Sequence, residues 1–168
     1  TDTYTNPVNG LQEILNDRPT LSIRATIAAE PGTLPAEIVA VVNHLRSLNG
    51  VEEADGRVRA KRLAQAEYVA RLLDGLRASY PGVPVVSVGD YNAFEVNDGY
   101  VDVLGVVRGV PSPASDVVLF GADLLASDFL LAPVVAATPA DQTYSYVFEG
   151  SAQSLDHGPG AAVLWSPG

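Results

Sequence analysis

The sequence contains no cysteine, no methionine and only two histidines among its 168 residues. The lack of cysteine excludes disulfide bonds, thiolate metal sites and cysteine nucleophiles. It leaves the compartment open, because a secreted domain with an adequate core does not need disulfides. No apolar run approaches the roughly 20 residues that a membrane-spanning helix requires. The first ten residues are polar and show no signal peptide, so no membrane association is expected.

Positive charge is also scarce, since ten lysines and arginines accompany 20 acidic residues for a formal net charge of −10. Such a chain repels phosphate backbones at long range, which argues against a static nucleic-acid binder. An enzyme that meets phosphate through a divalent cation remains compatible, because the metal supplies positive charge locally. Six of the ten basic residues lie between Arg57 and Arg77. They fit either a solvated helix face or a partial phosphate-facing patch.

Hydrophobic residues make up 47% of the chain, which is enough for a packed core in one domain over residues 1–168. The clearest helix is expected at 57–80, where apolar residues recur at intervals of three and four. Short apolar runs at 38–42 and 83–88 are typical of strands buried on both faces. A strand, a long helix and a second strand in succession predict an α/β fold with a layered sheet.

Other segments carry weaker signals. Alternating or β-rich patterns predict further strands at 21–28, at 143–148 and from 154 onward. The segment 97–115 is rich in glycine, proline and serine and is expected to be loop or short helix. Two apolar runs fit strand and helix equally well, at 117–120 and 130–136. The residues 158–160, Gly-Pro-Gly, are expected to be a poor strand continuation.

Polar side chains follow the two central strands at the point where each strand ends. The run 38–42 is followed by His44, and the run 83–88 is followed by Asp90 and Asn92. Ligands of open α/β sheets bind at one end of the strands. If the backbone stays extended, Asp90 and Asn92 face one site and the residue between them points away. A carboxylate beside an amide can hold a hard metal ion and orient a phosphate or water.

Each of these residues also has an ordinary structural interpretation. Aspartate and asparagine cluster in turns for purely local hydrogen-bonding reasons. A lone histidine after a strand can be a surface or structural residue, although its chemistry also suits proton transfer. Adjacent side chains of a strand diverge, so Asp156 and His157 would not form a simple dyad. Spacing alone therefore leaves a reactive site and a simple turn both open.

Taken together, segments in this order resemble motifs of the endonuclease/exonuclease/phosphatase superfamily. The matching segments are 41–47 (VVNHLRS), 62–66 (RLAQA), 89–102 (GDYNAF continuing to DGYVD), and 144–157 (YSYVF, then SLDH). Several motifs in the right order are more specific than any one of them. The resemblance runs from about Arg18 to His157 and is nearest to the predicted extracellular nucleases of bacteria. It implies part of a four-layer α/β sandwich, with one sheet-and-helix half more complete than the other.

What the resemblance implies for chemistry is hydrolysis of a phosphodiester with Mg²⁺, or with Mn²⁺ or Ca²⁺. It implies a nuclease with DNA or RNA as substrate, in an extracellular or cell-surface setting. By motif match, His44 would contact the scissile phosphate. Asp90 would bind the metal or the attacking water, and Asn92 would orient that water.

Four more residues receive roles from the same resemblance. Asn43 and Arg46 flank the histidine and are assigned to substrate binding. Asp156 matches the carboxylate that orients the catalytic base. His157 would itself be that base only if residues 156–157 were the closing Ser-Asp-His motif. The preceding residues favour the earlier aspartate motif instead.

The resemblance also implies parts that this sequence lacks. Relatives carry an early asparagine and a metal-binding glutamate on strands that no segment before Thr20 is expected to supply. We therefore expect a single domain over 1–168 that is incomplete at both ends and has little or no activity. Sheet edges and an apolar sheet face would then be exposed, and self-association or pairing with the missing segments would cover them. Two alternatives stay open: a non-catalytic self-associating or binding module, and a phosphoesterase acting on phospholipid or small phosphate esters.

Overall fold

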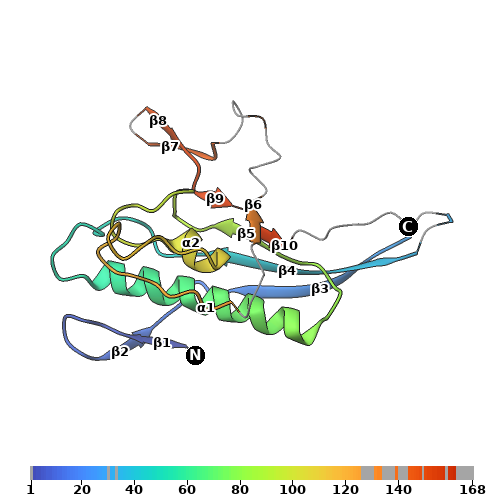
Figure 1. The fold of residues 1–168 in the computed structure, drawn as a ribbon, viewed down its shortest axis with the longest axis horizontal. Coiled ribbons are helices and arrows are strands. Elements are labelled where there is room, and N and C mark those ends of the chain that lie inside the picture. Colours follow the sequence, from blue (N-terminus) through green and yellow to red (C-terminus); the bar gives the residue numbers. More distant parts are fainter. Residues whose placement is uncertain are drawn as a thin grey trace.

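A mixed six-stranded sheet with two helices packed on one of its faces forms the centre of the molecule (Figure 1). The computed structural model describes residues 2–29, 31–32, 34–125, 131–133, 139, 144–148, 150–157 and 159–161. The helices are α1 (Arg57–Ser79) and α2 (Val103–Arg108). This arrangement confirms the predicted α/β class and the helix expected at 57–80. Within the described ranges, no helix has the length and apolarity needed to cross a bilayer.

Strand order along the sheet is β3-β4-β5-β10-β6, and β9 also pairs with β5. β3 runs antiparallel to β4, β4 runs parallel to β5, and the remaining pairings are antiparallel. The six strands are β3 (Leu21–Ile27), β4 (Ala36–His44), β5 (Val85–Asp90), β6 (Leu131–Pro133), β9 (Asp156–His157) and β10 (Pro159–Ala161). The strands expected at 21–28, 38–42 and 83–88 are therefore confirmed.

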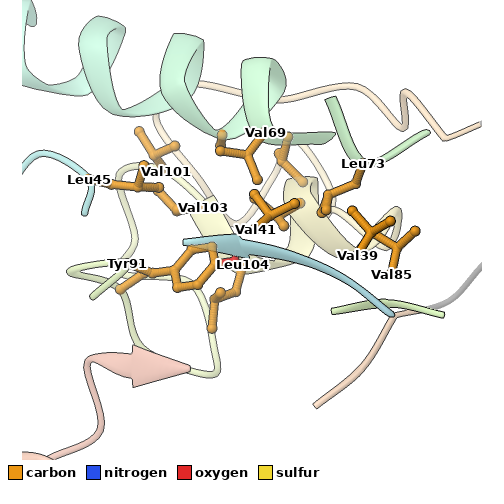
Figure 2. Close-up of a cluster of buried hydrophobic side chains, with 14 residues drawn as sticks. Val39, Val41, Leu45, Val69, Leu73, Val85, Tyr91, Val101, Val103 and Leu104 are labelled. Carbon is orange, nitrogen blue, oxygen red and sulfur yellow. The ribbon is translucent and has the colours of Figure 1, made fainter. Parts of the chain in front are cut away.

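The chain passes from β4 to the parallel strand β5 through α1, whose inner face packs on the sheet. Apolar side chains of α1 fall at helical spacing and pack on alternate residues of the two strands. Figure 2 shows Val69 and Leu73 of α1 beside Val39, Val41 and Val85 of the sheet. All five are fully buried, so this face of the sheet has the close packing expected of a core.

The opposite face of the sheet is apolar and open to solvent. The register places Leu21, Ile23 and Ile27 of β3 on the same side as Val42 of β4, which in turn pairs with Val88 of β5. All five are exposed, with Ile23 at 47%. The predicted exposed apolar face is confirmed. The prediction that both central strands are buried on both faces is wrong, because helices cover only one side.

Two hairpins stand outside the main sheet, and the first of them lies before Thr20. They are β1 (Thr3–Thr5) with β2 (Gln12–Ile14), and β7 (Tyr146–Phe148) with β8 (Ser151–Gln153). Strands therefore do form before Thr20, because Asn6 caps a local turn by accepting from the Val8 amide at 2.8 Å. Within the described part of the chain these two strands pair only with each other, and they dock on α1 through an ion pair of Glu13 with Arg57 at 2.8 Å.

The weaker predictions have mixed outcomes. β7 lies within 143–148, β9 lies within the strand expected from 154, and the short helix α2 lies within 97–115. Residues 117–120 form neither helix nor strand, whereas β6 settles 131–133 as a strand. Residues 130, 134–136 and 143 lie outside the described part. The expectation is wrong for residues 159–160, because Pro159 opens β10, and a first strand position tolerates proline. Residue 158 lies outside the described part.

The core beneath α1 predicts a clear contrast between two leucines. Leu73 is 1% exposed, whereas Leu34 is 89% exposed. We expect Leu73→Ala to lower the free energy of unfolding by about 2–5 kcal/mol, because it removes packed methyl groups and leaves a cavity. The control Leu34→Ala should change it by less than about 0.5 kcal/mol. Urea unfolding followed by circular dichroism measures both, and equal effects would contradict the assignment of this core.

Candidate active site at the strand tips

Three strands bring polar residues together where β4 and β5 end. The parallel register pairs His44 with Asp90, and β9 places Asp156 opposite Asp90 from the other side. The His44 Nε2 atom lies 3.5 Å from the Asp90 Oδ2 atom, and both side chains remain partly exposed. Asp90 therefore meets His44, which lies 46 positions earlier in the sequence, and Asp156, which lies 66 positions later, where β4 and β5 end.

Gly89 allows the end of β5 to lie close to the end of β4. Its φ of +133° is a conformation that residues with a side chain rarely adopt. A Cβ atom at this position would collide with the backbone carbonyl oxygen of Asn43. The glycine therefore permits the close strand approach that brings Asp90 beside His44.

Asn43 lies beneath the site and faces the core rather than solvent. Its Nδ2 donates to Ser87 Oγ at 2.8 Å and to the Tyr91 hydroxyl at 3.2 Å, while Thr20 donates to its Oδ1 at 2.9 Å. The Ser87 and Tyr91 hydroxyls also share a hydrogen bond, and burial raises the pKa of Tyr91 to about 12. Since the amide is satisfied internally, the geometry gives no support to the predicted substrate contact of Asn43.

Asn92 lies in a tight turn directly after Asp90. Its φ is +48°, so the backbone is left-handed there and not extended as expected. The Asn92 amide donates to Asp90 Oδ1 at 2.8 Å, and Asn92 Nδ2 donates to the Leu45 carbonyl at 3.0 Å. Tyr91 between them is buried, which agrees with the expectation that it points away. The local turn and the candidate site are thus the same structure, because the turn fixes the direction of the Asp90 carboxylate.

A cleft of about 870 Å³ opens at these strand tips. Asp90, Asn92 and Asp156 all line it. The other lining residues combine polar groups with an apolar and aromatic wall: Ser47, Leu48, Asn49, Val51, Glu52, Phe94, Asp98, Tyr100, Gln153 and Leu155. A concave site with apolar walls and a few convergent polar groups is the usual form of a small-molecule or active site.

The remaining predicted residues occupy different places. His44 is adjacent to Asp90 but is not among the residues that line the cleft. The Arg46 side chain donates through Nη2 to the Asn49 carbonyl at 3.3 Å, along the loop that forms one wall. The backbone of His157 pairs with Gly89, and its side chain lies outside what the structure describes.

Two buried side chains of α1 were not identified from the sequence. Arg62 and Lys61 are both buried, although the basic run was expected to form a solvated face or a phosphate-facing patch. Burial lowers the pKa of Arg62, and the neighbouring Asp98 carboxylate opposes this. The available signal was position, because Arg62 lies four residues before Ala66 on the helix face that packs on the sheet.

The side-chain oxygen atoms that line the cleft determine which metal ion these residues could hold. No group of three or more histidine, aspartate or glutamate side chains able to hold a metal occurs among the described residues. Asp90 and Asp156 do pair across the strands and line one cleft. Mg²⁺ usually keeps several waters and uses one or two carboxylates together with substrate phosphate oxygens. These residues therefore fit a Mg²⁺ ion held partly by water, and they do not form a complete protein cage.

The conformation of Gly89 predicts a strong contrast between two glycines. We expect Gly89→Ala to destabilise the fold by at least about 3 kcal/mol, because positive φ strain adds to a backbone collision. Gly75 lies within α1, and an added Cβ there meets no atom within 4 Å. Gly75→Ala should stabilise the fold by about 0.5–1 kcal/mol. Urea titrations measure both changes, and a tolerated Gly89→Ala would contradict the described close approach.

Comparisons with known proteins give only partial likenesses. No family model matches the chain, and no curated protein matches it. Similar solved structures include the human Nocturnin catalytic domain with bound sulfate anion, at 17% identity and a TM-score of 0.49 over 96% of this chain and 46% of that chain. Truncated Caenorhabditis elegans TDP2 (14%, TM-score 0.45, 77% and 43%) and C. elegans TDP2 (14%, 0.43, 83% and 40%) are also similar. This chain spans less than half of each, and TM-scores below 0.5 carry no conclusion about its activity.

Proposed function

We propose that this chain is the middle and late part of a metal-dependent phosphodiesterase of the endonuclease/exonuclease/phosphatase superfamily, and that it acts as a nuclease. The observation that carries the proposal is the meeting of His44 with Asp90, and of Asp90 with Asp156, where β4 and β5 end and β9 begins. Three motifs far apart in the sequence thereby meet, with Asp90 and Asp156 lining the cleft and His44 lying beside Asp90. The proposal includes three further parts: membership of the bacterial extracellular branch, an extracellular or cell-surface location, and a single, incomplete domain over 1–168.

Each residue of the site has a separate role in binding the phosphate or in orienting the attacking water. The Asp90 Oδ1 atom accepts the Asn92 amide, so the carboxylate is held in one direction while Oδ2 faces His44. The exposed imidazole of His44 is placed to donate to a phosphate oxygen at the rim of the cleft. The Nδ2 atom of Asn92 is committed to Leu45, which leaves its amide oxygen to accept from a water. Mg²⁺ at Asp90 and Asp156 would polarise the phosphate and activate that water.

The proposal includes slow turnover. The chain holds two histidines, and His44 is assigned to phosphate contact. By resemblance, residues 156–157 match the earlier aspartate motif, so we do not assign the base to His157. A positioned general base contributes about 10²–10⁴-fold to rate, so a site without one hydrolyses slowly.

Substitution at Asp90 tests the hydrolase proposal. We expect Asp90→Asn to lower metal-dependent nicking of supercoiled plasmid by about 100-fold or more, since it removes the carboxylate charge from the metal site. The matched control is Asp116→Asn, an exposed carboxylate outside the cleft, which should retain wild-type activity. The assay is run with Mg²⁺, Mn²⁺ and Ca²⁺ in turn, with EDTA as the metal-free condition.

The substrate panel separates the remaining possibilities. RNA, phospholipid and bis(p-nitrophenyl) phosphate are assayed beside plasmid DNA. Hydrolysis of phospholipid or bis(p-nitrophenyl) phosphate, without hydrolysis of DNA or RNA, would identify lipids or small phosphate esters as the substrate class in place of nucleic acid. Equal activity of wild type and Asp90→Asn would reject the role of Asp90. Absence of metal-dependent hydrolysis of all substrates would reject the enzyme and favour the second candidate.

The second candidate function is a self-associating or binding module, and the open apolar sheet face favours it. Exposed apolar patches of this kind mark interaction surfaces. Among the described strands, β3 is the outermost and pairs only with β4, so one of its edges presents backbone groups without a strand partner there. A second copy of the chain could cover both features.

Neighbouring residues of β3 provide a matched test of self-association. Ile23 points to the open face, whereas Ser22 points to the side that faces the helices. We expect Ile23→Thr to lower the weight-average sedimentation coefficient at a fixed concentration, because it removes apolar contact area while keeping a β-branched residue. Ser22→Thr should leave the coefficient unchanged. A wild-type protein that sediments as a monomer at every concentration would exclude this candidate.

A further inference from the structure

The guanidinium of Arg62 connects three separate segments inside the protein. Its side chain is 1% exposed. Nη1 donates to the Arg46 carbonyl at 2.7 Å and to the Asn92 carbonyl at 2.9 Å, and Nη2 donates to Asp98 Oδ2 at 3.0 Å. A single nitrogen atom of α1 thus bridges the loop after β4 and the loop after β5.

Each of the three acceptors belongs to a segment that forms the candidate site. Arg46 lies two residues after His44, and Asn92 lies two residues after Asp90. Asp98 lines the cleft, and its second oxygen, Oδ1, accepts from the amides of residues 100 and 101 at 2.8 and 2.7 Å. The guanidinium therefore connects both strand-tip loops to the turn that carries the aromatic wall of the cleft.

Gln65 completes the attachment one helical turn later. It accepts from the Arg46 amide through Oε1 at 2.8 Å and donates through Nε2 to the Leu15 carbonyl at 2.9 Å. Both backbone polar groups of Arg46 are consequently bound to α1 side chains, the carbonyl to Arg62 and the amide to Gln65. The loop after β4 is fixed to the helix and not only to the sheet.

The free-energy balance of a buried ion pair indicates that Arg62 contributes mainly by holding its acceptors in place and less by stabilising the fold. A buried ion pair stabilises a fold weakly, because desolvation of both charges offsets their attraction. Burial lowers the pKa of Arg62 here, which reflects that desolvation cost. Planar guanidinium donors, however, can hold several acceptors in fixed directions, whereas a lysine ammonium is a point donor on a flexible stem.

We propose that Arg62 is a positioning residue of the site, which fixes the distance between the strand-tip loops and therefore the placement of His44 relative to Asp90. Its consequence for turnover rests on the proposed phosphodiesterase function. Its structural part, the coupling of the two loops, does not depend on that function. This separation allows two independent measurements.

The structural measurement compares amide ¹H–¹⁵N chemical shifts in Arg62→Lys with those in Arg71→Lys. Arg71 lies on the same helix, is exposed, and pairs only with Glu67 among the contacts described for it. We expect Arg62→Lys to shift the amides of residues 44–47 and 90–93, with the distant half of β3 unchanged. The control should leave both strand-tip loops unchanged.

The kinetic measurement uses the best substrate of the panel. We expect Arg62→Lys to lower kcat about 10- to 100-fold with little change in KM, because a misplacement of about 1 Å at a reacting group has an effect of this size. If Arg62→Lys does not fold, Asp98→Asn serves in its place, since it keeps the shape of the side chain and weakens the ion pair. Circular dichroism confirms that the variant assayed is folded.

Opposite results would overturn the inference. Shift changes spread evenly over the sheet, or confined to residues next to position 62 on the helix, would show that Arg62 does not couple the loops. Unchanged kcat in a folded variant with a lowered melting temperature would reduce its role to stability. If the wild type hydrolyses none of the substrates, the proposed function fails, and the chemical shifts alone decide whether the loops are coupled.

Discussion

Parallel pairing between β4 and β5 determines on which face of the sheet the candidate residues of these two strands lie. Side chains alternate along a strand, so paired residues of two parallel strands point to the same face. Val39, Val41 and Asn43 therefore face the helices, while Val42 and His44 face the open side. Because His44 pairs with Asp90, both candidate side chains emerge on the open side, and Asn43 is directed into the core. A register shift of one residue would exchange these positions and remove the site.

The same alternation links the candidate site to the open apolar face. His44 and Asp90 continue the side of the sheet on which Val42 and Val88 are exposed, and they lie at the end of that face. A chain segment or partner that covers the apolar face would therefore border the site and limit the access of water to it. Water exclusion strengthens electrostatic interactions, so coverage and reactivity are physically coupled. The two candidate functions concern adjacent parts of one surface.

The sequence predicted the secondary-structure elements that depend on hydrophobic periodicity. It did not predict the burial and backbone conformations that depend on tertiary contacts. Helical spacing identified α1 and strand runs identified β4 and β5, since their apolar residues pack on one another. The position of Asp90 after a strand was also predictable. The burial of Arg62 was not, because it depends on carbonyl groups from loops 16 and 30 residues away in the sequence. A turn at Asp90 and Asn92 was one of the two alternatives, but its left-handed backbone and the contact of Asn92 with the Leu45 carbonyl were not predicted.

The basic residues of α1 form contacts within the protein, which bears on how the proposed phosphodiester substrate would approach the cleft. All six are engaged within the protein: Arg57 with Glu13, Arg59 with the carbonyls of residues 51–53 and the Tyr100 ring, Lys61 with Asp17, Arg62 with Asp98, Arg71 with Glu67, and Arg77 with Asp74. Their charge serves to attach the helix to its surroundings. The described lining of the cleft contains carboxylates and no lysine or arginine. A phosphodiester approaching Asp90 and Asp156 would be repelled unless a cation lay between them, which is the electrostatic reason to expect metal dependence.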